Sequence, residues 1–314
     1  MGASGHDAQP HQSVDLRGRR AGVVSAGQML LSFDGPVHAI KVGGADLVAL
    51  QRELGNMLPG WPCTSVAAAT APDITVARIG RGYEVRTQFP GYEAMPAADI
   101  WEAGYQTTSA LFLLTAAAAA DQCVIHAGAV EIDARLILFV GDTMAGKSSL
   151  ALHLAAADRR VFGDDRLVVT APTGIAPSAM ALGLARKLRL PLPTDFDPAA
   201  IAYARALARD AEAEDVVYLR ADPGRTAEFG ERLPIAAIVL LDRRAGIPAA
   251  LTPIGAADAV RRLIGLTVTS HMGAGEQLAL LSRLVGAVPI LRLSAPGSWA
   301  ACQALLAHRF EALP

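Results

Sequence analysis

The chain has 314 residues, of which 52% are hydrophobic and 18% charged, and its formal net charge is −2 at pH 7. Such a near-neutral composition gives no electrostatic argument for a nucleic-acid partner or for binding to an anionic membrane surface. The three cysteines lie far apart and form no C-x-x-C pair, so neither a disulfide framework nor a structural zinc site is expected.

No stretch is typical of a secretion signal or of a membrane span. The amino terminus lacks a basic start followed by an apolar segment. The longest apolar tract, Ser109 to Ala120, is shorter than the roughly 20 residues that cross a bilayer. We therefore expect a soluble protein of the reducing cytoplasm, with residues 1–13 as a disordered lead-in.

Residues 14–120 carry the pattern of a smaller α+β domain. A β-rich segment is expected over 22–33, and a short helix over 46–58 that its first residue would cap. Two strand-like segments within 74–89 flank a Gly-Arg-Gly turn, which predicts a hairpin. Residues 97–120 are predicted to form a helix. No catalytic arrangement is evident here, so we expect an accessory domain, with recognition of a peptide or protein partner as the alternative.

Residues 121–314 show the alternating strands and helices of an α/β nucleotide-binding domain. A strand over 124–132 carries His126. It is joined to the next strand by Asp133-Ala134, where alanine is unfavourable if the turn needs positive φ. Further strands are predicted at 160–169, 233–242 and 290–293, and helices at 197–212, 256–266, 274–285 and 299–310.

A phosphate loop follows the apolar strand 136–140, and a helical pattern follows the loop. Glycines allow backbone N–H groups to surround phosphate oxygens, and the helix amino terminus adds partial positive charge. In such loops the lysine reaches the β- and γ-phosphates and the next hydroxyl can bind Mg²⁺. The predicted nucleotide-binding residues are Gly141, Asp142, Thr143, Met144, Ala145, Gly146, Lys147, Ser148 and Ser149.

One predicted helix of about three turns follows the loop, and the chain then returns as a strand. Two adjacent carboxylates, Asp164 and Asp165, interrupt that returning strand. This short connection can bring the pair to the mouth of the loop, where the γ-phosphate would lie. One carboxylate could then hold Mg²⁺ while the other accepts a proton from an attacking hydroxyl. The alternative is an ordinary Asp-Asp turn that caps local backbone groups.

Two further residues compete for roles at this site. Asp242 ends an apolar strand, as the metal-binding Asp of a Walker-B segment does, but its approach to the loop depends on strand order. We rank it below the aspartate pair. His126 lies on the strand that pairs with the loop strand; a structural role and a catalytic role are both open for it.

His126, the segment Gly141 to Ser148 and Gly163-Asp164-Asp165 occur in an order and spacing that resemble the HPr kinase/phosphorylase family. The similarity covers roughly residues 124–169. It implies a P-loop fold that is also similar to phosphoenolpyruvate carboxykinase, with ATP and Mg²⁺ as cofactors. It further implies Asp164 as catalytic base, Ser148 and Asp165 as metal ligands, and His126 and Lys147 beside the transferred phosphate.

The sequence departs from the family in the loop and beyond it. Met144 replaces the middle loop glycine and Thr143 a serine. The family's Leu-Glu-Ile-Arg-Gly segment is absent, which argues against HPr as the acceptor and against reverse phosphorolysis. The basic segment with Arg186, Lys187 and Arg189 resembles that of shorter HPr-kinase-related proteins, some of them similar to lasso-peptide precursor kinases. These three residues could bind phosphate or a peptide carboxylate, or form a solvated basic turn.

The sequence therefore predicts an ATP-dependent kinase that phosphorylates a serine hydroxyl on a peptide or small protein. A regulatory nucleotide-binding module without transfer, and a kinase of free serine or a sugar, are the alternatives. No nucleic-acid or membrane partner is expected. The family resemblance implies a homo-oligomer, although no subunit interface is visible in the sequence.

Overall fold

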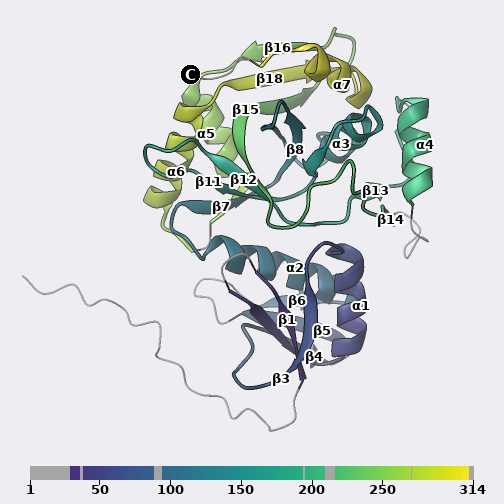
Figure 1. Ribbon diagram of the computed structural model, residues 1–314, viewed down its shortest axis with the longest axis vertical. Coiled ribbons are helices and arrows are strands. Elements are labelled where there is room, and N and C mark those ends of the chain that lie inside the picture. The colour runs from purple at the N-terminus through teal and green to yellow at the C-terminus, as the bar shows by residue number, and fades with distance from the viewer. Residues whose placement is uncertain are drawn as a thin grey trace, which may run out of the picture.

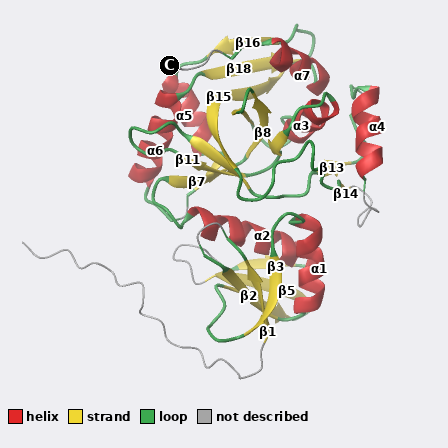
Figure 2. Ribbon diagram, viewed as in Figure 1, coloured by secondary structure: helices red, strands yellow, loops and turns green. Residues whose placement is uncertain are grey.

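The computed structural model describes residues 29–35, 38–87, 94–193, 195–208, 216–269 and 271–310. The predicted lead-in 1–13, the first part of the β-rich segment 22–33 and the end of the predicted helix 197–212 lie outside the described residues. The chain has a mixed α/β architecture with several sheets (Figures 1 and 2). In the described part of the chain, no helix is both long enough and apolar enough to cross a membrane.

The first region is a six-stranded sheet in the order β3-β1-β2-β4-β5-β6. Helix α2 packs on β4, β5 and β6 and also contacts β7 and β11 of the second region, so it lies between the two (Figure 1). The strands are β1 (Met29–Phe33), β2 (Ile40–Gly44), β3 (Cys63–Ala67), β4 (Ile74–Ile79), β5 (Gly82–Thr87) and β6 (Met95–Ala97), and the helices α1 (Leu47–Met57) and α2 (Ile100–Ala116).

The second region is built on a ten-stranded sheet in which β15 is parallel to β9 and β18. Its strands are β7 (Gln122–Ile125), β8 (Ala127–Ile132), β9 (Arg135–Val140), β10 (Val161–Gly163), β11 (Leu167–Thr170), β12 (Ser178–Ala181), β15 (Arg232–Arg243), β16 (Ala250–Pro253), β17 (Thr267–Val268) and β18 (Ile290–Ala295). A separate pair consists of β13 (Lys187–Arg189) and β14 (Val216–Tyr218). The helices are α3 (Lys147–Ala156), α4 (Pro198–Leu207), α5 (Ala256–Ile264), α6 (Ala274–Ala287) and α7 (Ser298–Ala307).

Strand β9, which leads into the phosphate loop, is apolar along its length because helices cover both faces of the sheet. Leu136, Leu138 and Val140 belong to the core formed with α5 and α6. Ile137 and Phe139 alternate with them and belong to the core formed with α3 and α7. A strand buried on both faces loses the polar/apolar alternation of a half-exposed strand. This burial fixes the loop at the carboxyl end of β9.

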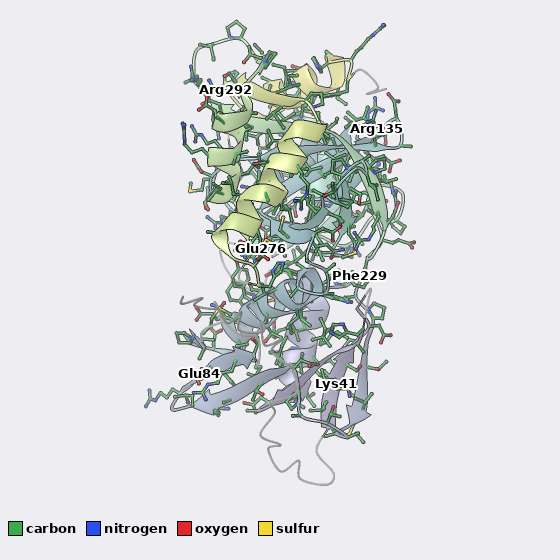
Figure 3. The ribbon with its side chains drawn as sticks, turned by 90° about the vertical axis from the view of Figure 1, so that its left-hand side faces the viewer. Lys41, Glu84, Arg135, Phe229, Glu276 and Arg292 are labelled. Carbon is green, nitrogen blue, oxygen red and sulfur yellow. The ribbon has the colours of Figure 1, made fainter. Side chains whose placement is uncertain are left out.

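The two regions share one apolar core rather than touching through polar surfaces. Trp61 stacks on Phe112 of α2 at 5.7 Å between ring centroids and contacts the ring of Phe229 at 4.6 Å. The same core includes Met180 and Leu182 of the second region. Figure 3 shows Phe229 at the level where the two regions meet. The predicted division at residue 120 stays a prediction, and the apolar contacts continue across it.

Three local expectations are corrected. The predicted strand 124–132 is interrupted at His126, because β7 and β8 pair with different neighbours. Asp46 precedes α1 at φ 51° without capping it, and its carboxylate instead accepts hydrogen bonds from Arg78 and Tyr83, each at 2.7 Å. For residues 186–189, the open alternative of a solvated basic turn does not hold, because Lys187 to Arg189 form the strand β13, which pairs with β14.

Two other local expectations are confirmed. Asp197 caps α4, since its carboxylate accepts the N–H of Ala199 at 2.8 Å. The turn between β8 and β9 has positive φ at both Asp133 (51°) and Ala134 (57°), so the alanine occupies the unfavourable conformation that the sequence suggested.

Candidate active site

The phosphate loop joins the carboxyl end of β9 to the first turn of α3. A Cβ on Gly141 would lie 2.8 Å from the Cβ of Ala145, so only glycine fits at this point of the turn. Gly146 has φ 97°, and a Cβ built there meets no atom within 4 Å. Open space beside backbone N–H groups at a helix amino terminus is suited to a phosphate.

Other predicted loop residues divide into exposed and half-buried positions. Asp142, Thr143 and Met144 are exposed, and Ala145, Ser148 and Ser149 are half-buried. Met144 has φ 69°, so it lies in the left-handed region that glycine favours. The loop therefore contains a non-glycine residue in a conformation that is costly for it.

Lys147 is buried and bonds to the backbone of the phosphate loop. Its Nζ donates to the carbonyl oxygens of Gly141 at 2.7 Å and Asp142 at 3.1 Å. Burial lowers the pKa of Lys147, and the negative charges of Asp165, Asp142 and Asp164 act in the opposite direction. The aspartate turn is thus close enough to influence the loop lysine electrostatically.

Asp164 lies in the turn between β10 and β11, with a side chain that is 4% exposed. Burial, with a smaller effect from the charge of Asp165, raises the pKa of Asp164 to about 7. The Arg186 guanidinium and hydrogen bonds from the backbone N–H groups of Asp164 and Lys187 oppose this rise. A carboxyl group with a pKa near neutrality can accept a proton from an alcohol and release it again.

Asp165 is the more exposed member of the pair and contacts His126. The distance from Nε2 of His126 to Oδ1 of Asp165 is 3.1 Å, and Nε of Arg166 lies 3.7 Å from Oδ2. Burial acts to raise the pKa of Asp165, but the His126 hydrogen bond and the charges of Arg166, His126 and Lys147 outweigh it, so the pKa is lowered. Asp165 is therefore ionised when Asp164 can still hold a proton.

His126 owes its position to the break between β7 and β8. Its backbone N–H donates to the carbonyl of Leu266 at 2.8 Å, so the residue bonds to the segment before β17 instead of continuing one ladder. The side chain faces Asp165 from this break. The structure thus brings His126, Asp165, Asp164 and Lys147 to one place.

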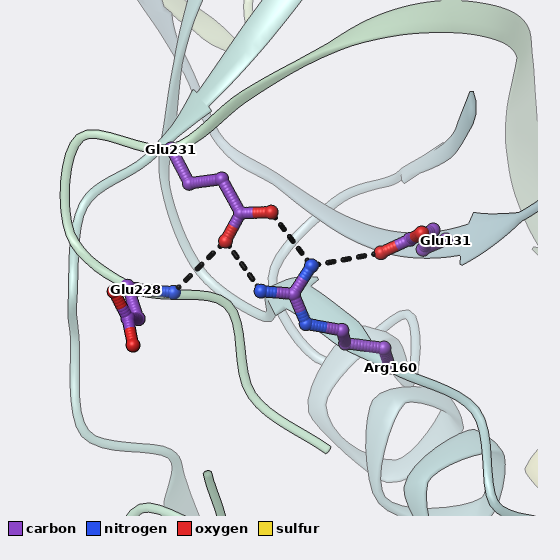
Figure 4. Close-up of polar contacts among 4 residues, drawn as sticks. All are labelled: Glu131, Arg160, Glu228 and Glu231. Atoms are coloured by element: carbon purple, nitrogen blue, oxygen red, sulfur yellow. Dashed lines mark hydrogen bonds and ion pairs between the residues drawn. The ribbon is translucent and has the colours of Figure 1, made fainter. Parts of the chain in front are cut away.

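A half-buried arginine, Arg160, holds the strand that precedes the aspartate turn (Figure 4). Nη1 of Arg160, which directly precedes β10, donates to Glu131 of β8 at 2.9 Å and to Glu231 at 2.6 Å, and Nη2 makes a second bond to Glu231. These bonds lower the pKa of Glu231. Glu231 also accepts the backbone N–H of Glu228 at 3.3 Å. These bonds connect the start of β10, strand β8 and the segment 228–231.

The three residues of the basic segment have different environments. Arg186 is buried, and its Nη2 donates to Tyr203 Oη at 3.1 Å and Thr226 Oγ1 at 3.0 Å. Its Nη1 is buried and has no hydrogen-bond acceptor among the described residues. The ammonium of Lys187 lies over the rings of Trp101 and Tyr105, and Arg189 is exposed. Of the three side chains, the Arg186 guanidinium is the one that lowers the pKa of Asp164, and Lys187 contributes through its backbone N–H.

Strand order places Asp242 near the loop, but its carboxylate is engaged elsewhere. Leu240 pairs with Val140 in parallel register, so Asp242 lies level with Asp142. Its Oδ2 is 2.9 Å from Nε of Arg244 and 3.5 Å from Ser294 Oγ. The charge on Asp242 is thus compensated by Arg244, whereas Asp165 contributes to the electrostatics of Lys147.

Among the described residues, no group of three or more His, Cys, Asp or Glu is placed to hold a metal ion. Mg²⁺ in nucleotide sites is bound by one or two protein oxygens together with phosphates and waters, so such a group is not required. The Ser148 hydroxyl and the ionised Asp165 carboxylate are oxygen donors of the kind that suits Mg²⁺.

One residue near the loop has no signal in the local sequence. Nη1 of Arg262, on α5, lies 3.9 Å from Oδ2 of Asp142. This contact joins positions far apart in the chain, so neither motif spacing nor periodicity could predict it.

Comparisons with known proteins add little to this geometry. The chain matches no model of a known protein family, and no curated protein matches it. Among solved structures, an HPr(Ser) kinase/phosphatase from Coxiella burnetii is similar over 55% of this chain and 85% of that one, with 11% identity and a TM-score of 0.27. A likeness of this size carries no argument about function, so the proposals below depend on the residues of the chain itself.

Proposed function

We propose that this protein is an ATP- and Mg²⁺-dependent kinase that transfers the γ-phosphoryl group to a serine hydroxyl on a peptide. The observation that carries the proposal is the electrostatic proximity of a phosphate-loop lysine to two carboxylates with opposite pKa shifts. Phosphoryl transfer depends mainly on positioning and charge neutralisation, so few groups are needed.

Each residue has a distinct part in this proposal. Lys147 exchanges its loop carbonyls for phosphate oxygens, which a flexible ammonium can do without moving the helix. Ser148 and Asp165 would hold Mg²⁺, which neutralises charge on the phosphates when bound. His126 orients Asp165 through their 3.1 Å contact. Asp164 takes the proton of the serine hydroxyl as its oxygen attacks the γ-phosphorus.

The peptide acceptor follows from the basic segment and from the resemblance to shorter HPr-kinase-related proteins. Arg186 offers a buried guanidinium nitrogen that has no acceptor within the described part of the chain, and its charge acts on the proposed base. A guanidinium in such a place can bind a carboxylate, including that of a peptide carboxyl terminus. A kinase of free serine would use the same contact, so acceptor length must be tested directly.

A second candidate, a nucleotide-binding module without transfer, is favoured by one observation. Asp164 is 4% exposed, so an acceptor hydroxyl reaches it only if neighbouring groups move. In such a module the aspartate would be a structural group beneath the loop, and bound ATP would not be consumed at a rate set by an acceptor.

The decisive experiment is a transfer assay with radiolabelled ATP against panels of serine-containing peptides, free amino acids and sugars. The proposal expects label on a peptide serine, and Lys147→Ala should lose both nucleotide binding and transfer. Label on free serine or a sugar would select the small-molecule kinase. Tight ATP binding without label on any acceptor would select the module.

Lys147→Ala also removes the buried alkyl chain, so Lys147→Met is the matched control: it keeps an alkyl chain of similar length and removes the charge. If Lys147→Met binds ATP as tightly as the wild type, the loop does not bind phosphate in the proposed way.

A further inference from the structure

Arg262 is an exposed arginine that reaches the phosphate loop from another part of the fold. Its Nη1 lies 3.9 Å from Oδ2 of Asp142, with side chains 65% and 83% exposed respectively. The neighbouring Arg261 has a different partner, since it pairs with Asp258 of the same helix at 2.9 Å. Two adjacent arginines on α5 therefore have separate environments, and only Arg262 contacts the loop among the contacts described.

The backbone next to Arg262 is held by the buried side chain of Leu263 and by hydrogen bonds of the segment that follows α5. Leu263 is fully buried in the core with β9, which keeps this turn of α5 in one rotation. Thr267 Oγ1 donates to the carbonyl of Leu263 at 2.6 Å, and β17 pairs with β7. Between them, Leu266 accepts the N–H of His126. The segment that carries Arg262 is thus bonded to the strand break of His126 while its guanidinium extends to the loop.

An exposed ion pair at 3.9 Å is a weak interaction, because water screens it and both side chains lose freedom. A bound triphosphate would bring several negative charges to the same loop and would compete with the Asp142 carboxylate for the guanidinium. Arginine suits the three equatorial oxygens of a transferring phosphoryl group because its planar fork donates several hydrogen bonds.

We propose that Arg262 leaves Asp142 when nucleotide binds and donates hydrogen bonds to the γ-phosphoryl group during transfer, acting as an arginine supplied by the same chain. In that step the acceptor oxygen forms a bond to phosphorus, the bond from phosphorus to the β–γ bridging oxygen breaks, and the acceptor proton passes to Asp164. ADP leaves with the bridging oxygen. This inference rests on the proposed function, since it assigns a residue to the same transfer.

The test compares Arg262→Ala, Arg262→Lys and the control Arg261→Ala, which removes another exposed arginine one residue away. Arginines in this role contribute about 10³-fold or more to turnover. We expect Arg262→Ala to lower kcat by about 10³-fold or more, while the Kd for ADP, which lacks the γ-phosphate, stays within about twofold. Arg262→Lys should recover part of the loss, and Arg261→Ala should match the wild type.

Added guanidinium ion can occupy the space left by the Arg262 side chain and restore its charge. Such a rescue of activity is expected if Arg262 acts on the phosphoryl group and is not expected if its role is only structural. It should raise the kcat of Arg262→Ala and leave that of Arg261→Ala unchanged. A kcat for Arg262→Ala within about threefold of wild type overturns the inference. So does an equal loss in Arg261→Ala, or a loss that accompanies a weaker Kd for ADP.

Failure of the proposed function gives a different pattern. If the wild type labels no acceptor, the same variants are compared by their slow ATP hydrolysis, where water replaces the hydroxyl. Arg262→Ala should reduce this hydrolysis as well. Unchanged hydrolysis in Arg262→Ala would reject the role of Arg262. If the wild type does transfer phosphate and Arg262→Ala transfers it equally fast, the proposed function stands and only the role of Arg262 is rejected.

Discussion

The phosphate loop and the aspartate turn differ in where their chemistry resides. In the loop, Asp142, Thr143 and Met144 are exposed, and backbone groups form the surface that a phosphate would meet. In the turn, a single buried side chain, Asp164, has its pKa set by burial and by charged neighbours. A site made from backbone tolerates substitution as long as the chain keeps its path, whereas a site made from one side chain does not.

This difference explains how the loop can carry Met144 at a position with positive φ. Met144 adopts φ 69°, and its side chain is 80% exposed, so it displaces no neighbour. The turn shows no comparable freedom, because Asp164 is surrounded by Arg186, Lys187 and Asp165. The following predictions test the contrast, beginning with the largest effect.

Asp164→Asn should reduce transfer by at least about 10³-fold, because the amide cannot accept the hydroxyl proton and general base catalysis contributes up to about 10⁴-fold. Nucleotide binding should change little, since the loop backbone is untouched. Single-turnover transfer and the Kd for ATP, measured on the same preparation, check this. Near-normal transfer would show that Asp164 is not the base.

Asp165→Asn should lower kcat/KM by about 100-fold, as expected for loss of one charged group at a phosphoryl-transfer site, and should raise the Mg²⁺ concentration needed for half-maximal activity. Asp242→Asn should have less than about a tenfold effect, because Arg244 already compensates that carboxylate. A Mg²⁺ titration of both variants decides between the two. The reverse order of effects would make Asp242 the metal ligand.

The buried turn should also impose a pH dependence on stability. The pKa of Asp164 is about 7 in the folded chain and about 3.8 in the unfolded chain. Below about pH 4 the group is protonated in both states. Between about pH 4 and pH 7 the unfolded chain releases this proton while the folded chain retains it. The free energy of unfolding therefore falls over this range, by up to a few kcal/mol.

Asp164→Asn removes this titration. The free energy of unfolding of the variant minus that of the wild type should therefore be larger at pH 8 than at pH 5, because only the wild type loses this stabilisation as pH rises. Urea titrations at the two pH values measure the difference. An equal difference at both values would mean that Asp164 is not held protonated by its surroundings.

Met144→Gly should have the smallest effect. A non-glycine residue in the left-handed region costs about 1 kcal/mol, so glycine should ease the loop and tighten ATP binding by less than about tenfold. Ala134→Gly is the matched control, since it relieves the same strain in the turn between β8 and β9. It should raise the melting temperature and leave the Kd for ATP unchanged. Weaker ATP binding by Met144→Gly would contradict the argument.

Local patterns were sufficient to predict the elements that create the site. The strand, loop and helix around Lys147 follow from a buried apolar run, two glycines and helical periodicity. The turn at Asp164 and Asp165 follows from its short connection to that helix. Both features depend on residues close together in the sequence, where spacing limits geometry. The roles of these residues, the acceptor, the oligomeric state and the cellular location stay predictions.

Long-range pairing explains what local patterns could not predict. The interruption at His126 arises because β7 joins β11 and β17 whereas β8 joins β9 and β10. Arg262 meets Asp142 only because α5 returns to the loop. The first of these features is decided by strand order and the second by the path of α5, and one sequence reveals neither.

The aromatic contacts of Trp61 with Phe112 and Phe229 have a practical consequence for experiments on separate fragments. A fragment that begins at residue 121 would lose the surface against which Phe229, Met180 and Leu182 pack, and would expose these side chains to water. Such a shortened protein should aggregate or unfold at lower temperature, even though it retains the entire nucleotide-binding motif. Studies of this protein are therefore best made on the intact chain.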